Sequence, residues 1–503
     1  LGLSNIIMFY DSNNIQLSTT VDDVDTEDVA AKYRAWNWNV LECEGNSAES
    51  IRAALNAALT EQERPTIIIG KTLMGFGAMD ANGGSFENKI STHGQPISAA
   101  GADPRKTIEN LGGDSENPFV IFPEVEELYR ARREELRAWA AERKEVERKW
   151  REENPELSAK LDLFLSGKTP EIDYSKIEIA AGSATRNASA TILGAFAEQI
   201  ENMVVASADL SNSDKTDGFL KKTHAFTKGD WSGKFFQAGV SELTMACIMN
   251  GMALHGGIIP ACGTFFVFSD YMKPAVRLAA LMRTHVIYIW SHDSFRVGED
   301  GPTHQPIEHE AQIRLMEHLK NHNGERSTLV LRAADGAEMV EAWKMAIEEE
   351  RPVALITSRQ NIKDLPAASG NRRAEAEGAR KGGYVVWEAE NAKATLLASG
   401  SEVSTLIEGA ELLAAEGINV RVVSIPSEGL FRDQSCEYQR EVLGDLPRYG
   451  LTAGLPVTLE GLVGFGGRVH GVDHFGYSAP YKVLDEKFGF NGATVAAEVK
   501  ELL

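Results

Sequence analysis

The sequence VIYIWSHDSFRVGEDGPTHQP, residues 286–306, joins an unbroken apolar run to a polar loop. The apolar run, residues 286–290, is rich in β-branched and aromatic residues, which predicts a buried strand of a parallel sheet. The loop carries Gly and Pro and follows the carboxyl end of this strand, where α/β folds place their active sites. Several of its side chains offer donors, acceptors and an acid or base near neutral pH. They are His292, Asp293, Glu299, Asp300 and His304. A polar surface loop is the alternative interpretation.

Strands and helices are predicted to alternate along the chain, the rhythm that βαβ units give to a parallel sheet. The expected strands are residues 6–10, 38–42, 66–70, 203–206, 263–268, 286–290, 328–332, 353–357, 394–398 and 419–425. The expected helices are residues 26–36, 48–59, 123–160 and 496–502, a buried one after Glu242 and one after Ser399–Glu402. We therefore predict the α/β fold class, with three successive parallel-sheet units.

The composition is that of an ordinary globular protein, with 43% hydrophobic and 25% charged residues. A length of 503 residues is too great for one core, so about three domains are expected. The net charge of −22 disfavours a nucleic-acid surface, because a polyanion would be repelled, and favours a cytoplasmic protein. No apolar run approaches about 18 residues, so no membrane span is expected. The cysteines form no CxxC pair, which argues against a disulfide framework or zinc site, and Cys247 and Cys262 are expected in the core.

Polar residues crowd the end of the first predicted strand, in the segment YDSNNIQL at 10–17. Amide and backbone carbonyl oxygens suit a hard cation such as magnesium, which takes oxygen ligands and usually bridges to phosphate. Asn13 and the carbonyl of Ile15 could supply two such ligands. An Asn-rich turn without a metal is the alternative.

Glu242 begins a helix whose other residues are nearly all apolar or small, in SELTMACIMNGMALHGG at 241–257. A carboxylate there is costly to bury unless it is protonated or paired, although it could equally be an N-terminal glutamate that favours the helix dipole. The following segment, TFFVFSDY at 264–271, carries aromatic rings at 265, 268 and 271. These rings could stack on a flat heteroaromatic ligand, or they could simply pack in the core.

Four scattered polar residues complete the candidates: Arg186, Ser213, His292 and Arg359. Arg359 follows a predicted strand and could act as a fork for phosphate or carboxylate. Each could also be an ordinary surface residue, and nothing in the sequence alone brings the four together.

Taken together, these segments resemble transketolase, a family of thiamine diphosphate enzymes. The resemblance rests on GEDGPTHQP (298–306), SELTMACIMNGMALHGG (241–257), TFFVFSDY (264–271), SADL (207–210), SRQN (358–361) and HFGYSAP (474–480). It implies the transketolase-like thiamine diphosphate-binding fold and a homodimer with cofactor sites at its interface. By this resemblance residues 1–122 are the C-terminal part of the diphosphate-binding domain, 123–176 a helical connector, 177–365 the pyrimidine-binding domain and 380–503 the C-terminal domain.

The implied reaction is the reversible transfer of a two-carbon ketol unit from a ketose phosphate to an aldose phosphate, as in the pentose phosphate pathway. Thiamine diphosphate, held with Mg²⁺ or another divalent cation such as Ca²⁺, supplies the carbanion chemistry. By resemblance, Glu242 hydrogen-bonds the pyrimidine nitrogen of the cofactor and promotes its imino form. Burial of this carboxylate would raise its pKa and favour proton sharing.

The resemblance also implies roles for the other candidates. Cofactor contacts are expected from Leu17, His93, Asp209, Phe265, Phe268 and Tyr271. The residues expected to bind the sugar hydroxyls and to transfer protons are His93, Asp300 and His304. The terminal phosphate of the sugar is expected at Arg186, Ser213, His292 and Arg359, where two arginines give a local positive field. The metal ligands are Asn13 and Ile15.

One departure from the family pattern is serious. The Gly-Asp-Gly motif, whose aspartate binds the metal, would fall before residue 1, and no such motif occurs in the chain. We therefore expect that an N-terminal segment is missing. For the chain as given we expect weak or absent cofactor binding and negligible turnover, and for a parent protein that carries the segment we expect transketolase activity. The alternatives are an inactive fragment that only dimerises or binds a partner, and a related thiamine enzyme such as a formaldehyde-using transketolase or deoxyxylulose phosphate synthase.

Overall fold

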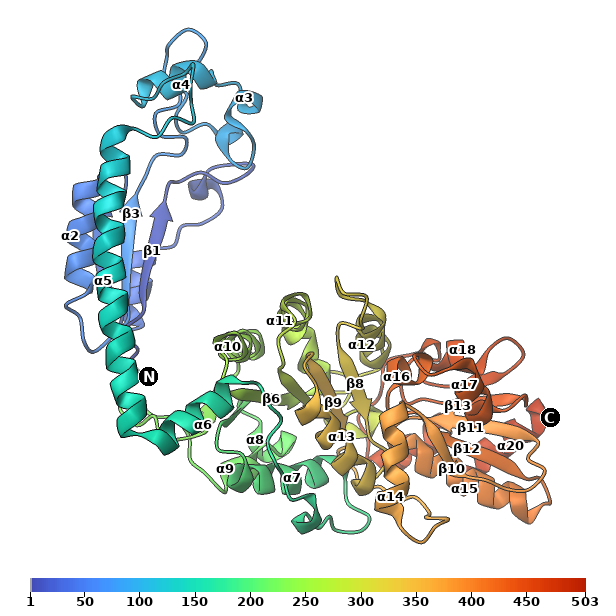
Figure 1. Ribbon diagram of the computed structural model, residues 1–503. Helices are drawn as coiled ribbons and strands as arrows, with labels where there is room; N and C mark the ends of the chain where they lie inside the picture. The colour runs from blue at the N-terminus through green and yellow to red at the C-terminus, as the bar shows by residue number, and fades with distance from the viewer. Residues whose placement is uncertain (1) are drawn as a thin grey trace. The chain divides into compact units, whose positions relative to one another are not determined.

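The computed structural model describes residues 2–503 and contains two compact units, one ending at Glu153 and the other running from Asn154 to Leu503 (Figure 1). Both are α/β units built on parallel strands, so the predicted fold class is confirmed. A helix with the length and apolar character needed to span a bilayer is not found among the described residues.

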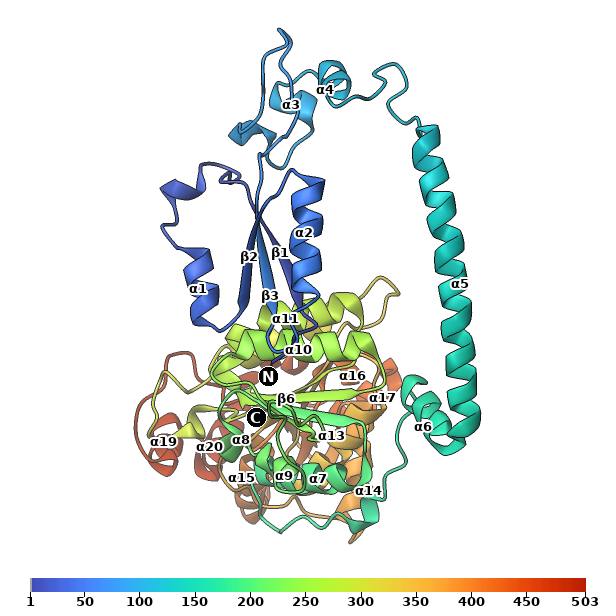
Figure 2. The ribbon, with the colours of Figure 1, turned by 90° about the vertical axis from the view of Figure 1, so that its left-hand side faces the viewer.

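The first unit is built on a three-stranded parallel sheet (Figure 2). Its strands, in spatial order, are β1 (Ile7–Ser12), β3 (Thr66–Lys71) and β2 (Asn39–Glu44). The β-branched run of β3 is almost wholly buried, as expected for a central parallel strand. The helices are α1 (Val29–Ala35), α2 (Ala48–Ala58), α3 (Ile97–Ala100), α4 (Pro104–Asn110) and α5 (Pro123–Glu153).

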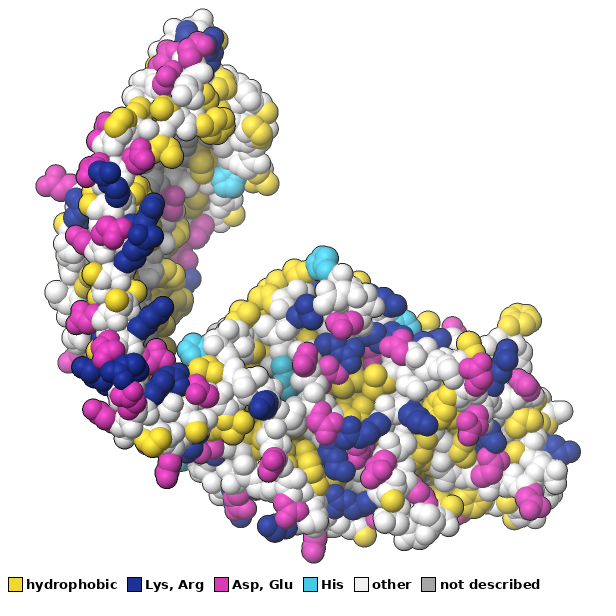
Figure 3. Space-filling view, in the orientation of Figure 1, with side chains coloured by type: hydrophobic (Ala, Val, Ile, Leu, Met, Phe, Trp, Pro, Cys, Tyr) yellow, Lys and Arg dark blue, Asp and Glu magenta, His cyan; other side chains and the backbone are white. Residues whose placement is uncertain are grey.

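Pro155 divides the charged segment that was predicted as one helix over 123–160. Instead α5 ends at Glu153, and α6 (Pro155–Leu165) begins with the proline in its first turn. Proline lacks an N–H and clashes with the carbonyl of a preceding turn, so it starts a helix rather than continuing one. Glutamate and arginine pair along α5 at spacings of three and four residues, and Figure 3 shows both charge signs interspersed there.

The second unit contains a six-stranded, fully parallel sheet with the order β5-β4-β6-β7-β9-β8. Its strands are β4 (Met203–Ser207), β5 (Phe235–Gln237), β6 (Ile259–Phe265), β7 (Ile287–Ser291), β8 (Leu329–Arg332) and β9 (Val353–Thr357). Helices α7 (Thr185–Gln199) and α13 (Gly336–Glu348) cover one face. The other face carries α10 (Glu242–His255), α11 (Ser269–Met282) and α12 (His309–His318) (Figure 1). The short helices α8 (Ser211–Asp214) and α9 (Asp217–Leu220) follow β4.

A five-stranded sheet with the order β10-β12-β11-β13-β14 completes the second unit. Its strands are β10 (Tyr384–Trp387), β11 (Ala394–Ala398), β12 (Val420–Ser424), β13 (Arg448–Leu451) and β14 (Arg468–His470). The prediction of a third parallel sheet is wrong at one edge, because β10 runs antiparallel to β12. Only residues 388–393 separate β10 from β11, too few for the crossover that parallel strands require. The helices are α14 (Arg372–Ala376), α15 (Glu402–Ala415), α16 (Glu428–Arg432), α17 (Cys436–Leu443), α18 (Val457–Val463), α19 (Tyr481–Phe488) and α20 (Gly492–Leu502).

Two local predictions in this unit are wrong. The strand expected at 263–268 is β6, which begins at Ile259 and ends at Phe265, because residues 259–263 pair in register with β4 despite Pro260 and Gly263. The helix after Glu242 is buried on one side only: Met245 and Met249 lie in the core, whereas Leu243 and Leu254 are exposed. Cys247 lies on the exposed side of this helix, so it is not the core residue that was predicted. Cys262 is buried as predicted, and all four cysteines are free thiols.

Candidate active site

The candidate residues of the second unit gather at one edge of the six-stranded sheet. Asp209 follows β4, Phe268 follows β6, His292 follows β7 and Arg359 follows β9. These four strands are successive neighbours in the sheet and run parallel, so their carboxyl ends lie together. This is the edge at which open α/β sheets bind ligands.

His292 is the centre of this group. Its Nε2 atom lies 3.2 Å from Nη1 of Arg186 and its Nδ1 atom 2.8 Å from Oγ of Ser291, while its ring stacks on Phe265 at 3.7 Å between centroids. Burial lowers the pKa of His292 to about 2, and the positive charges of Arg186, Arg359, His304 and Lys215 add to this effect. The imidazole is therefore neutral at physiological pH. Because a guanidinium can only donate, we assign the ring proton to Nδ1 and the acceptor lone pair to Nε2.

Arg186 connects His292 to the loop after β4. Its Nη1 atom donates to the carbonyl of Ser213 at 2.9 Å, and its buried Nε atom has no hydrogen-bond partner in residues 2–503. Burial, and then the nearby charge of Arg359, lowers the pKa of Arg186, and the carboxylate whose charge opposes this effect is Asp214. The structure thus brings together Arg186, Ser213, His292 and Arg359, with an N–H that is free to meet an anion.

Two residues beside Ser213 were missed by the sequence analysis. Asp214 is buried and accepts hydrogen bonds from Oγ of Ser207 at 2.6 Å and from the amide and hydroxyl of Thr216 at 2.9 and 2.7 Å. Burial raises the pKa of this carboxyl to about 6. Lys215 takes a left-handed backbone conformation with φ 71° and adds to the positive field at His292. The sequence could have pointed to both residues, because they directly follow the candidate Ser213.

Aromatic rings form a ledge beside this cationic group. Phe265 stacks with Phe268 at 5.8 Å between centroids, and Phe268 stacks with Tyr271 at 6.1 Å. His304 meets the edges of the first two rings at 6.3 and 5.4 Å. Phe265 is buried, but Tyr271 is 60% exposed. Rings that are stacked and partly open can accept a flat heteroaromatic group.

Glu242 fits both interpretations that the sequence left open, since it is a buried carboxylate and also begins a helix. It is the first residue of α10, where the helix dipole favours a negative charge, and it is only 8% exposed. A buried carboxylate at a helix start retains the capacity to accept a hydrogen bond from a ligand N–H.

Hydrogen bonds join the loop at 298–306 to the HFGYSAP motif at 474–480. Nε2 of Gln305 donates to the carbonyls of Gly298 and Tyr477, both at 2.9 Å, and the Ser478 hydroxyl donates to the carbonyl of Glu299. Gly298 takes φ 87°, in the left-handed region that favours glycine. Asp300 and Asp209 are exposed, and Asp209 also has a positive φ.

Asn13, Ile15, Leu17 and His93 belong to the first unit. Oδ1 of Asn13 accepts a hydrogen bond from the Ile15 amide at 2.9 Å, beyond the carboxyl end of β1, and both residues line a pocket of about 1150 Å³. An amide oxygen has a second lone pair, so this all-oxygen donor set fits a hard cation. Leu17 is 70% exposed and lies against Gly94, next to His93, whose buried Nδ1 atom lacks a partner in the described part of the chain.

Three protein-family models match the chain. They are the thiamine diphosphate binding domain of transketolase over residues 1–170, the pyrimidine binding domain of transketolase over residues 181–364 and the transketolase-like C-terminal domain over residues 382–491.

Relatives and solved structures agree with these models. The chain is 40% identical over 516 residues to a transketolase of Halalkalibacterium halodurans, with coverage of 100% of this chain and 73% of the relative. It superposes on transketolase from Leishmania mexicana with a TM-score of 0.89 and 31% identity, covering 100% of this chain and 72% of the other. Transketolase from Pichia stipitis in complex with sedoheptulose-7-phosphate gives a TM-score of 0.87, 31% identity and the same two coverages.

Proposed function

The chain belongs to the transketolase family, enzymes that move a two-carbon ketol unit from a ketose phosphate to an aldose phosphate, and we propose how its residues serve that reaction. One observation carries the proposal: Arg186, whose buried Nε–H has no partner within residues 2–503, and Arg359 impose their charge on a neutral His292 at the carboxyl edge of the sheet. A phosphate dianion would accept the free N–H and relieve the repulsion between the guanidinium groups. These residues and Ser213 form the subsite for the terminal phosphate of the sugar.

Thiamine diphosphate, when bound, supplies the electron sink that no side chain can provide. Glu242 would hydrogen-bond the pyrimidine ring nitrogen, share a proton with it and so favour the imino form. The ledge of Phe265, Phe268 and Tyr271 binds the same ring by stacking. The exposed Asp209 contacts the cofactor from the loop after β4.

The first unit holds the charged end of the cofactor. Asn13 and the carbonyl of Ile15 are ligands of a divalent cation, Mg²⁺ or Ca²⁺, which neutralises the diphosphate. Leu17 gives an apolar contact. The Nδ1 atom of His93, which lacks a partner among the residues that the structure describes, serves the cofactor or the substrate.

Asp300, His304 and His93 bind the sugar hydroxyl groups and move protons near the reacting carbons. Both acidic and basic groups are needed, because the hydroxyls must be bound in one state of the reaction and deprotonated in another. The exposure of Asp300 leaves it free to meet a substrate.

We further propose the domain limits given by the sequence: residues 1–122 and 177–365 as the diphosphate- and pyrimidine-binding domains, 123–176 as a connector and 380–503 as the C-terminal domain. The protein is a cytoplasmic homodimer of the pentose phosphate pathway, with its cofactor sites at the subunit interface.

A cofactor titration and a product assay together test these assignments. In a protein that also carries the N-terminal segment expected from the sequence, calorimetry should give saturable binding of thiamine diphosphate that depends on Mg²⁺ and is weakened by Asn13→Ala. Xylulose 5-phosphate with ribose 5-phosphate should then yield sedoheptulose 7-phosphate and glyceraldehyde 3-phosphate. Metal-independent binding would contradict the roles of Asn13 and Ile15, and product formation only with formaldehyde as acceptor would contradict the proposed substrates.

A further inference from the structure

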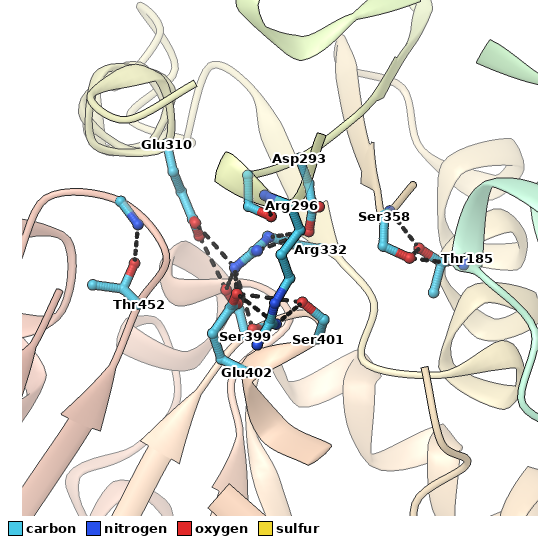
Figure 4. A network of polar contacts seen from close by, with 12 residues as sticks. Thr185, Asp293, Arg296, Glu310, Arg332, Ser358, Ser399, Ser401, Glu402 and Thr452 are labelled. Atoms are coloured by element: carbon cyan, nitrogen blue, oxygen red, sulfur yellow. Dashed lines mark hydrogen bonds and ion pairs between the residues drawn. The ribbon is translucent and has the colours of Figure 1, made fainter. Parts of the chain in front are cut away.

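A buried ion network joins the five-stranded sheet to the loop that carries His292 (Figure 4). Its centre is Arg332, the last residue of β8, which is 1% exposed. The guanidinium of Arg332 lies 2.7 Å from Oδ2 of Asp293 and 2.5 Å from Oε2 of Glu402. It also lies 3.3 Å from Oε2 of Glu310 and donates to the carbonyl and hydroxyl of Ser399, each at 3.2 Å.

Arg296 forms a second connection from the same loop. Its Nε atom lies 2.6 Å from Oδ1 of Asp485, and its Nη1 atom donates to Oγ of Ser401 at 2.9 Å. Nη1 also lies 3.7 Å from Oε1 of Glu402. The two oxygens of Glu402 therefore face two different arginines, one within the loop and one that binds the loop at Asp293.

The network has a direct consequence for His292. This residue is not glycine, yet it has φ 63°, a left-handed conformation that persists only where the surroundings hold it. Asp293 follows it directly and is held by Arg332, while the ring of His292 is held by Phe265 and Arg186. The position of the imidazole therefore depends on the anchoring of Asp293.

Stability alone is a poor reason for such a network. Removing several charges from water is costly, and well-packed apolar residues often stabilise a core as well as a buried ion pair does. The directional hydrogen bonds of Arg332 to Asp293 and Ser399, and those of Arg296 to Asp485 and Ser401, add a fixed geometry. The carboxylate of Glu402 holds the two guanidinium groups in this arrangement by its charge. In this molecule the geometry that they fix is that of the loop from Asp293 to Arg296.

We propose that Glu402 is a positioning residue for the phosphate subsite, holding the His292 loop through Arg332 and Arg296. This inference rests on the proposed function of that subsite. It gives the C-terminal part of the chain a role in substrate recognition.

The test compares Glu402→Gln, which keeps the shape but removes the charge, with Glu402→Asp, which keeps the charge. Glu411→Gln is the matched control, because Glu411 is exposed on the same helix. Calorimetry with ribose 5-phosphate should show Kd raised about three- to thirtyfold in Glu402→Gln, the range expected for coupling through a contiguous polar network. Glu402→Asp should recover part of the affinity, and the control should match the wild type.

Steady-state kinetics gives a second readout that a purely structural role would not change. Glu402→Gln should raise KM for xylulose 5-phosphate more than KM for the unphosphorylated ketose erythrulose, with kcat for erythrulose preserved. An unchanged Kd for ribose 5-phosphate in folded Glu402→Gln would overturn the inference. If circular dichroism shows that this variant is unfolded, Ser399→Ala decides: a raised Kd supports the inference and an unchanged Kd overturns it.

Arg359→Ala separates this inference from the proposed function. If Arg359→Ala weakens the binding of ribose 5-phosphate and Glu402→Gln does not, the proposed subsite is supported and the proposed role of Glu402 is wrong. If Arg359→Ala has no effect, the proposed subsite itself is wrong.

Discussion

Nη1 of Arg186 lies 3.2 Å from Nε2 of His292, although the two residues are 106 positions apart in the sequence. The contact directs a guanidinium N–H at an unprotonated ring nitrogen, which makes His292 an acceptor toward Arg186. Protonation of His292 would place a second positive charge against the first. The arrangement is therefore prepared for an anion, whose charge would offset the repulsion among these groups.

The first prediction concerns the protonation state of His292. Because its pKa is lowered to about 2, nitrogen-15 NMR of labelled histidine should show a neutral ring with the proton on Nδ1 at every pH from 5 to 8. Arg186→Met removes one cause of the shift and should raise the pKa toward its ordinary value of about 6.5. Titration of the wild-type signal near pH 6.5 would contradict the assignment.

The second prediction concerns substrate charge. Arg359→Ala removes one of the two guanidinium groups and should raise KM for phosphorylated substrates by roughly 10²-fold, the effect of losing a charge-assisted hydrogen bond of about 3 kcal/mol. Effects on an unphosphorylated donor such as erythrulose should be much smaller. Arg373→Ala is a suitable control, because its guanidinium donates to backbone carbonyls away from this site. Equal losses with both classes of substrate would exclude a phosphate role.

The third prediction concerns Glu242. Glu242→Ala should lower turnover by roughly 10²–10⁴-fold, the range for loss of a group that promotes proton transfer. The melting temperature should change little, because Glu242 is the first residue of α10 and its loss removes a favourable interaction with the helix dipole of only about 0.3–1 kcal/mol. The exposed Glu198 of the same unit provides the control substitution, Glu198→Ala. Near-normal turnover in Glu242→Ala would refute the role.

The sequence predicted the long strands well but not their neighbours in space. Strands such as β9 and β11 have the predicted bounds because an apolar run between turns is a local signal. The short strands β5 and β14 carry too few residues to give such a signal. The order β4-β6-β7-β9, which gathers the site residues, depends on long-range packing that no local pattern encodes.

The candidate site likewise contains residues that local sequence patterns predicted and residues that only the fold brings together. Its aromatic and loop residues were predicted because they lie in contiguous motifs such as residues 264–271 and 298–306. Arg332 and Glu402 were not singled out, because each is an ordinary residue of its own segment and only the fold brings them within 2.5 Å. Asp214 was missed because burial, not residue type, makes it unusual.

The last prediction uses the raised pKa of Asp214. The pKa is about 6 in the folded protein against an ordinary value of 3.8, so the folded state binds this proton more tightly than the unfolded state does. The contribution to stability is fully present below pH 3.8 and is lost as pH rises through 6. At neutral pH the loss amounts to about 3 kcal/mol, at about 1.4 kcal/mol for each pH unit of the shift.

Asp214→Asn should avoid this loss, because an amide oxygen can still accept from Thr216 while the amide nitrogen donates to the Ser207 hydroxyl. Calorimetry should therefore show that the free energy of unfolding of the variant, relative to that of the wild type, rises by about 2 kcal/mol from pH 4.5 to pH 7.5. Asp445→Asn, at an exposed position, should follow the wild-type curve at every pH. A constant difference between Asp214→Asn and the wild type across this range would mean that the carboxyl group titrates alike in the folded and unfolded states, and that its burial does not govern its charge.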